Sequence, residues 1–260
     1  MPLPRVSCRC LCFAAFVLQA FGLSLGLPFS VHAESNPEFR PALIGNGPNS
    51  LVNLIDTAKL HQAGQGDAVV MFDQMIFPFP VKGAYGSVYQ GTPGSQLLQK
   101  AILKALNEAE FIPAIAEHKT TGVDFHGTVM FFASQKPSLR VFAHQDRGEL
   151  AHFADFVAPQ LIGGSTKWDA NDPQLEAARR RRKEGAVVLS LHVSDRGKLL
   201  SSKVISEEPA GFNFGAALLK SFASARFIPG FRNGKPVECT FEVTEPVSPY
   251  GRYRGEVSYR

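Results

Sequence analysis

Disulfide-forming cysteines are scarce in this sequence. Three of its four cysteines, Cys8, Cys10 and Cys12, lie within the first twelve residues. If that segment is removed on export, only Cys239 remains and no intrachain disulfide can form. The rest of the chain must then be stabilised by hydrophobic cores, without covalent cross-links.

Long apolar runs are also absent, apart from one near the start of the chain. Residues 11–27 are mostly apolar over 17 residues, but they include Gln19 and fall short of the roughly 20 residues that a membrane-spanning helix needs. Two arginines precede the run and small residues follow it, which is the layout of a secretory signal peptide. We therefore predict that residues 1–33 are a signal peptide cleaved after Ala33. The alternative is an uncleaved membrane anchor.

A large excess of one charge is missing as well. The chain has 27 basic and 23 acidic side chains, and loss of residues 1–33 would remove two arginines and leave a net charge of about +2. This balance does not indicate nucleic-acid binding. One basic run stands out as a candidate partner-binding site for anionic lipid, a polyanion or an acidic receptor segment, and it comprises Arg179, Arg180, Arg181, Arg182 and Lys183. The alternative is a solvated helix face or linker.

Motifs of common active sites are absent too. The sequence has no nucleophile elbow, no phosphate-binding loop and no dinucleotide fingerprint. His118 and His126 are eight residues apart, as are His144 and His152, whereas zinc ligands usually lie closer together. Cys239 alternates with apolar neighbours and is interpreted as a small core residue. We expect a protein that is not an enzyme and that holds no metal or cofactor.

What the chain does contain is a clear strand–turn–strand pattern in its second half. Residues 185–193 are apolar and rich in β-branched side chains, as in a strand. Residues 194–197 supply Asp and Gly for a tight turn, and residues 198–206 form the returning strand. A β-hairpin is therefore predicted here.

A helix and a third strand complete this unit. In residues 212–227 the apolar side chains recur at spacings of three and four, which predicts one helix that Pro229 stops. Asn233 and Gly234 predict a turn into a half-buried strand, since residues 237–243 alternate between apolar and polar. The predicted order is β-β-α-β.

The same pattern occurs earlier in the chain. The phrase AEFIPA at 109–114 resembles ARFIPG at 225–230, and residues 66–72 and 124–132 match the first and last strands of the later unit. The apolar stripe of the helix also repeats, and the equivalent residues are Leu98 and Phe214, Ala101 and Ala217, and Ile102 and Leu218. Because these features keep the same order, we interpret them as an internal duplication.

The duplication predicts an α+β fold with two tandem β-β-α-β units, each a small antiparallel sheet packed on one helix, after the signal peptide. A turn-rich segment separates the units, so we place the boundary near Gly163. Residues 50–162 are then a divergent first unit and residues 163–260 the second. Residues 34–49 contain Asn, Pro and Gly and are expected to be a flexible tail.

Motif residues run through the second unit in a fixed order. A glycine opens the first strand, an Asp-x-Gly hairpin follows, an amphipathic helix leads to a basic-aromatic-x-Pro phrase, and a Gly-x-Pro-Val phrase enters the last strand. These positions are Gly185, Asp195, Gly197, Phe214, Arg226, Phe227, Pro229, Gly234 and Pro236. In this order the unit resembles the TonB C-terminal domain family over about residues 175–245. The first unit keeps the Phe-x-Pro phrase but lacks the Gly-x-Pro-Val entry.

The resemblance implies a protein that binds by adding a partner's strand to its own sheet, because an open sheet edge presents unpaired backbone groups. We predict a non-enzymatic binding protein, periplasmic or secreted, that engages an envelope or outer-membrane protein and can self-associate. The alternative is a membrane-tethered TonB-type energy transducer for outer-membrane transport, which would contact the membrane through an uncleaved N-terminal helix. Energy transducers of this family have a long Pro-rich spacer, whereas residues 34–60 hold three prolines.

Overall fold

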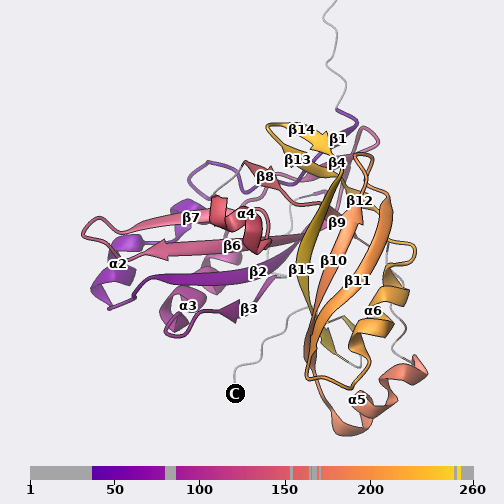
Figure 1. The fold of residues 1–260 in the computed structure, drawn as a ribbon. Coiled ribbons are helices and arrows are strands. Elements are labelled where there is room, and N and C mark those ends of the chain that lie inside the picture. Colours follow the sequence, from indigo (N-terminus) through magenta and orange to yellow (C-terminus); the bar gives the residue numbers. More distant parts are fainter. Residues whose placement is uncertain are drawn as a thin grey trace, which may run out of the picture. The chain divides into compact units, whose positions relative to one another are not determined.

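The computed structural model describes most of the chain after residue 36 (Figure 1). The described residues are 37–79, 86–152, 155–163, 165, 169, 171–248 and 251–252. The predicted signal peptide and its cleavage site lie outside them. Within them the chain forms short helices and small antiparallel sheets, so the predicted α+β class is confirmed.

The first half contains a β-β-α-β unit whose helix packs on an antiparallel sheet. Its elements are β2 (Ala68–Ile76), β3 (Gly86–Gly91), α3 (Gln96–Leu106) and β6 (Val123–Phe132). β2 pairs with β3 on one side and with β6 on the other. Leu98 and Ile102, four residues apart on α3, are fully buried in one core with Phe72 and Phe125 of the sheet.

The second half repeats this arrangement. Its elements are β10 (Gly185–Val193), β11 (Leu199–Glu208), α6 (Phe214–Phe222) and β15 (Cys239–Ser248). β10 pairs with β11 and with β15, and the short β16 (Gly251–Arg252) adds to the end of β15. The predicted stripe of α6 is confirmed, because Phe214, Ala217, Leu218 and Phe222 are all buried.

The two halves share their strand register, with an offset of 116 or 117 residues between equivalent positions. The equivalent cross-strand pairs include Asp73–His126 and Ser190–Glu242, and Phe72–Val88 and Leu189–Val204. Both sheets therefore have the same strand order and the same face turned to the helix. The predicted fold of two tandem β-β-α-β units is confirmed.

Each half also has a small three-stranded sheet, which was not predicted. The strands are β1 (Phe39–Arg40), β4 (Ala114–Ala116) and β5 (Lys119–Thr121) in the first half, and β8 (Phe156–Val157), β13 (Gly230–Arg232) and β14 (Lys235–Val237) in the second. In both sheets a two-residue arm pairs with the first strand of a tight hairpin. Glu117 and His118 turn one hairpin and Asn233 and Gly234 the other, all with positive φ, so the predicted Asn-Gly turn is present.

The first arm replaces most of the expected flexible tail. Within residues 37–49, Phe39–Arg40 form β1, Leu43 pairs with Ile112, and Ala42 is fully buried. A strand of two residues has no alternation from which it could be predicted, and its partner lies far away in the sequence. Two short helices follow this arm, α1 (Leu51–Leu54) and α2 (Thr57–Gln62).

The predicted helix end at Pro229 is wrong. α6 ends at Phe222, and Phe227–Ile228 form the strand β12, which pairs with β9 (Gln160–Ile162). Both residues of β12 are buried by this pairing, which satisfies their backbone groups as well. The Phe-Ile-Pro phrase is therefore an extended joint between the helix and the small hairpin.

Strand pairing joins the two halves directly. β9 pairs with β12 of the second half and with β6 of the first, so one sheet runs in the order β12-β9-β6-β2-β3. β7 (Ser138–Phe142) also pairs with β6. The core of the first half includes Ile228 and Phe231, and the core of the second includes Phe156 and Leu161. These contacts cross the boundary predicted near Gly163.

Candidate functional site

The motif residues of the second half hold the fold together. At Gly197, φ is +75° and an ideal Cβ would lie 1.9 Å from the carbonyl oxygen of Phe227. The backbone N–H of Phe227 donates to the carbonyl of Gly197 at 2.9 Å. At Gly185, a Cβ would lie 2.5 Å from the carbonyl oxygen of Glu208 and 2.9 Å from the ring of Phe214. Both glycines are required for close backbone approach.

The remaining motif residues divide into buried and exposed positions. Phe214, Phe227 and Pro229 are buried, and Gly234 turns the small hairpin. Asp195 and Pro236 are exposed. Arg226 is exposed too, but its guanidinium donates to the carboxylate of Glu117 in the first half at 2.8 Å. These residues are spread along the unit and do not converge on one pocket.

The basic run lies at the end of a short helix, α5 (Glu176–Arg181), which follows a 3-10 turn, η1 (Pro173–Leu175). Arg179 donates to the carbonyl of Asp172 at 3.0 Å, and Arg180 forms an ion pair with Glu176. The guanidinium of Arg181 lies 5.8 Å from the centre of the Phe212 ring.

The last two residues of the run lead from α5 into β10. Arg182 has positive φ and Lys183 donates its backbone N–H to the carbonyl of Ala178 at 2.9 Å, which closes the helix. Both side chains are exposed, and within the described part of the chain neither forms an ion pair. The local contacts of the first three residues fit a helix end, while Arg182 and Lys183 offer accessible positive charge.

One long sheet edge in the second half is covered. The backbone N–H of Glu242 donates to Asp146 Oδ2, and that of Thr244 donates to Gln145 Oε1, both at 3.3 Å. The outer side of β15 is thus capped by side chains of the first half. Its far end pairs with β16.

The other long edge, formed by β11, is open. β11 has ten residues, pairs with β10, and has no strand on its other side among the described residues. The backbone N–H groups of Glu242 and Thr244 point away from β10. In an antiparallel ladder the backbone groups of their partners, Ser190 and Val188, must then point away from β15 and towards β11.

The same alternation identifies the outward-facing residues of β11. Lys203 and Ser206, which pair with Ser190 and Val188, direct their backbone groups inwards. Ser202 and Val204 consequently present unpaired N–H and C=O groups to solvent.

Two β-bulges interrupt β11, and each leaves an aliphatic side chain outside the ladder. The register shifts next to Leu189 and next to Val193, which leaves Ile205 and Leu200 without a direct partner. These residues are 47% and 45% exposed. The edge therefore combines unpaired backbone groups with two exposed apolar side chains, which suits an extended peptide with alternating apolar residues. No sequence signal predicts the bulges.

A buried polar cluster lies on the first sheet. Asp73 Oδ1 accepts from the backbone N–H of Ser87 at 3.0 Å and from its hydroxyl. His126 Nε2 lies 3.6 Å from Glu245 Oε1, which comes from the second half. Burial raises the pKa of the Asp73 carboxyl, and Glu245 adds to the rise, while His126 and Ser87 oppose it. Burial also raises the pKa of Tyr89 well above its usual range.

This cluster predicts a pH effect on stability. The raised pKa means that the folded protein favours the protonated Asp73 carboxyl over the carboxylate. The stability that the protonated carboxyl contributes is fully present below pH 3.8 and is lost as the pH rises through the raised pKa. Asparagine cannot ionise, so Asp73→Asn should gain stability relative to the wild type as the pH rises from about 4 to about 7. Urea unfolding across this range measures the difference, with Asp195→Asn in the exposed turn as the control. A difference that stays constant with pH would contradict the prediction.

The cysteine and a further histidine of the second half are partly buried. Burial raises the pKa of the Cys239 thiol to about 11, so it is protonated at neutral pH. His192 is half-buried and lies 3.0 Å from Glu238. In the described ranges, no three His, Cys, Asp or Glu side chains are arranged to bind a metal ion. Of the helices in these ranges, none has the length and hydropathy needed to cross a bilayer.

Comparison with known families identifies the second half. Residues 176–245 match the model of the Gram-negative bacterial TonB protein C-terminal family. The matched segment runs from α5 through β10, β11 and α6 into β15. Over these residues the second half is therefore similar to the C-terminal domain of Gram-negative bacterial TonB proteins. Searches of curated proteins and of solved structures found no match to the chain.

Proposed function

We propose that this is an exported, non-enzymatic binding protein of the periplasm, which engages an envelope or outer-membrane protein through the edge of β11. The observation that carries the proposal is the open ten-residue edge of β11 within the segment that matches the TonB C-terminal family. Backbone groups at Ser202 and Val204 supply hydrogen bonds for an added strand, and Leu200 and Ile205 supply apolar contact.

The covered edge of β15 supports this assignment. Its outward N–H groups at Glu242 and Thr244 are already bonded to Asp146 and Gln145, so a partner strand would have to displace them. β11 needs no such displacement. The exposed cations Arg182 and Lys183 are proposed as a second, electrostatic contact with an acidic partner segment.

We also propose that residues 50–162 are a divergent second copy of the same domain. The family match does not extend to this segment, and the proposal is supported by the common strand register and the equivalent hairpins of the two halves. A membrane-tethered energy transducer is the alternative function. N-terminal sequencing of the cellular protein distinguishes the two, because a start near residue 34 supports export and an intact N-terminus supports tethering.

A proline substitution tests the binding edge. Ser202→Pro removes an outward-facing N–H and leaves the inward ladder of β11 in place. We expect it to reduce the amount of envelope protein captured by the immobilised protein by about fivefold or more, since one hydrogen bond and the close approach of a strand are both lost. Circular dichroism should show an unchanged fold.

Ser202→Ala is the matched control, because it keeps the backbone N–H and should capture as much as the wild type. Equal capture by Ser202→Pro and Ser202→Ala would show that the β11 edge is not the binding surface. Capture and bound proteins are quantified by mass spectrometry of extracts from the producing bacterium.

A further inference from the structure

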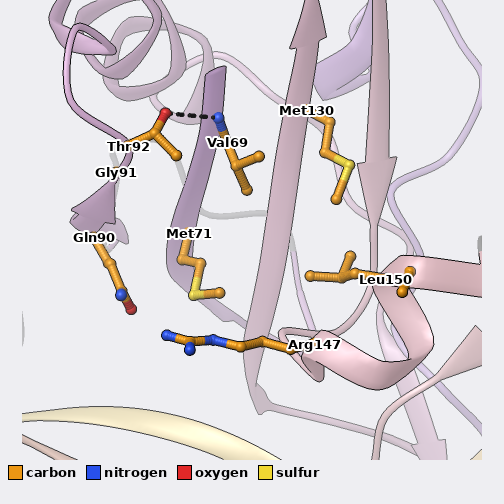
Figure 2. Close-up of a pocket in the computed structure, with 9 residues that line it drawn as sticks. Val69, Met71, Gln90, Gly91, Thr92, Met130, Arg147 and Leu150 are labelled. Atoms are coloured by element: carbon orange, nitrogen blue, oxygen red, sulfur yellow. Dashed lines mark hydrogen bonds between the residues drawn. The ribbon is translucent and has the colours of Figure 1, made fainter. Parts of the chain in front are cut away.

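A groove of about 590 Å³ lies on the face of the first sheet opposite α3, which is within the size range of small-molecule sites (Figure 2). β2, β3 and β6 form its floor, and α4 (Arg147–His152) forms one side. Its apolar lining consists of Val69, Met71, Met130, Leu150 and Ala151. The family match lies outside this half of the chain. β11 does not line the groove, although Ile205 and Ser206 of β11 line a smaller cavity that adjoins it.

Polar groups gather at one end of the groove. Figure 2 shows the guanidinium of Arg147 and the amide of Gln90 on the same side of Met71. The same three residues also line a smaller adjoining cavity of about 130 Å³, which Glu242 lines as well. The groove itself is therefore lined by apolar side chains along most of its length, and Arg147 is the charged residue in its lining.

The cation in the groove has no acidic partner in the described part of the chain. Arg147 is exposed and forms no ion pair there, Glu242 included. Its acidic neighbours in sequence are engaged elsewhere. Glu149 pairs with Arg232 at 2.6 Å, and Asp146 accepts backbone N–H groups of α4 and of β15.

The second half shows that the fold itself does not require this groove. The equivalents of Met71 and Met130 are Val188 and Pro246, and no described helix of the second half takes the place of α4. Two methionines in contact with a cavity form a surface that adapts to irregular apolar ligands.

From this combination we infer that the groove binds an amphiphilic carboxylate, with its apolar chain against Met71, Met130 and Leu150 and its carboxylate on Arg147. The guanidinium supplies paired N–H donors that match a carboxylate, and the Gln90 amide supplies one more donor. An amphiphile with a cationic head would place its charge beside the guanidinium of Arg147 and should bind more weakly.

Methionine-methyl NMR with dodecanoate as the probe tests the inference directly. Three of the four methionines of the sequence lie beyond the proposed signal peptide, and Met75 does not line the groove, so it serves as an internal reference. The methyl signals of Met71 and Met130 should shift with half-saturation below about 1 mM, while that of Met75 stays in place. Dodecyltrimethylammonium, which has the same chain and the opposite charge, should produce no saturable shift.

Three variants decide the outcome. Arg147→Gln should weaken dodecanoate binding roughly tenfold, because a charge-assisted hydrogen bond is lost. Arg196→Gln, in the exposed turn of the second half, should leave it unchanged. Ala151→Trp places a large ring from an exposed position of α4 into the groove and should abolish the shifts.

The inference is overturned if dodecanoate causes no saturable shift up to about 5 mM. It is equally overturned if all three methionines shift together, which would indicate general detergent binding, or if Arg147→Gln binds as tightly as Arg196→Gln. Binding at β11 is measured separately by Ser202→Pro, so failure of either idea leaves the other standing.

Discussion

Gly197→Ala should lower the free energy of unfolding by about 3 kcal/mol or more, a large effect for the addition of a single methyl group. Two costs combine at this position. Gly197 has φ +75°, which costs an L-residue roughly 1–2 kcal/mol. The added methyl would also lie 1.9 Å from the carbonyl oxygen of Phe227, so the β10–β11 hairpin or β12 must move. Urea unfolding followed by circular dichroism measures the loss.

Gly211→Ala separates these two costs. Gly211 has φ +83°, but an added Cβ there meets nothing within 4 Å. We therefore expect a loss of only about 1 kcal/mol at this position. If the two alanine variants were equally stable, the close contact between Gly197 and Phe227 would not exist in solution.

Removal of a core ring from either half should destabilise the whole protein. Phe125 and Phe214 are fully buried, one in each core, and Phe125→Ala and Phe214→Ala should each cost about 3–5 kcal/mol. Phe79→Ala is the control, since Phe79 is 61% exposed and its loss should change stability by no more than about 0.5 kcal/mol. Chemical unfolding measures all three.

The same two variants report on cooperativity. One sheet contains strands of both halves, and the core of the first half contains Ile228 and Phe231 of the second. We therefore expect a single unfolding transition that either substitution shifts, as seen by near-UV circular dichroism and by hydrogen exchange of both sheets. Two transitions, with Phe125→Ala shifting only one of them, would show that the halves unfold separately.

The large elements could be predicted from sequence because their signals are local. Spacings of three and four placed Phe214, Leu218 and Phe222 on the buried face of α6, and the Asn233-Gly234 pair marked a turn. The repeat was visible for the same reason, since helix stripes and strand patterns survive divergence. These patterns fixed the order of elements in both halves.

The arms and joints could not be predicted, because their pairing is long-range. Phe39 pairs with Ala116 and Ile228 with Gln160, and neither pair has a local pattern. Pro229 was expected to end the helix, but the burial of Phe227 and Ile228 against β9 decides where the helix stops. Tertiary pairing prevails here over a local rule.

The candidate sites, like the fold, could be predicted only where their signal is local in the sequence. An open sheet edge was expected from the resemblance, but that β11 provides it depends on Gln145 and Asp146 capping β15, which only the structure shows. The basic run was visible in the sequence, whereas its local contacts were not. The groove beside α4 was missed, because its lining comes from three strands and a helix.

The shared strand β9 has a practical consequence for anyone who wishes to isolate the second half. A fragment that starts at Gly163, or one trimmed to the family match at 176–245, would lose both β8 and β9. β12 and β13 would then each lose a partner strand and present unpaired backbone groups, and their side chains Ile228 and Phe231 would be exposed. Such edges promote aggregation. A fragment of the second half that keeps both partner strands must begin at Phe156 or earlier, within what looks by sequence like the neighbouring unit.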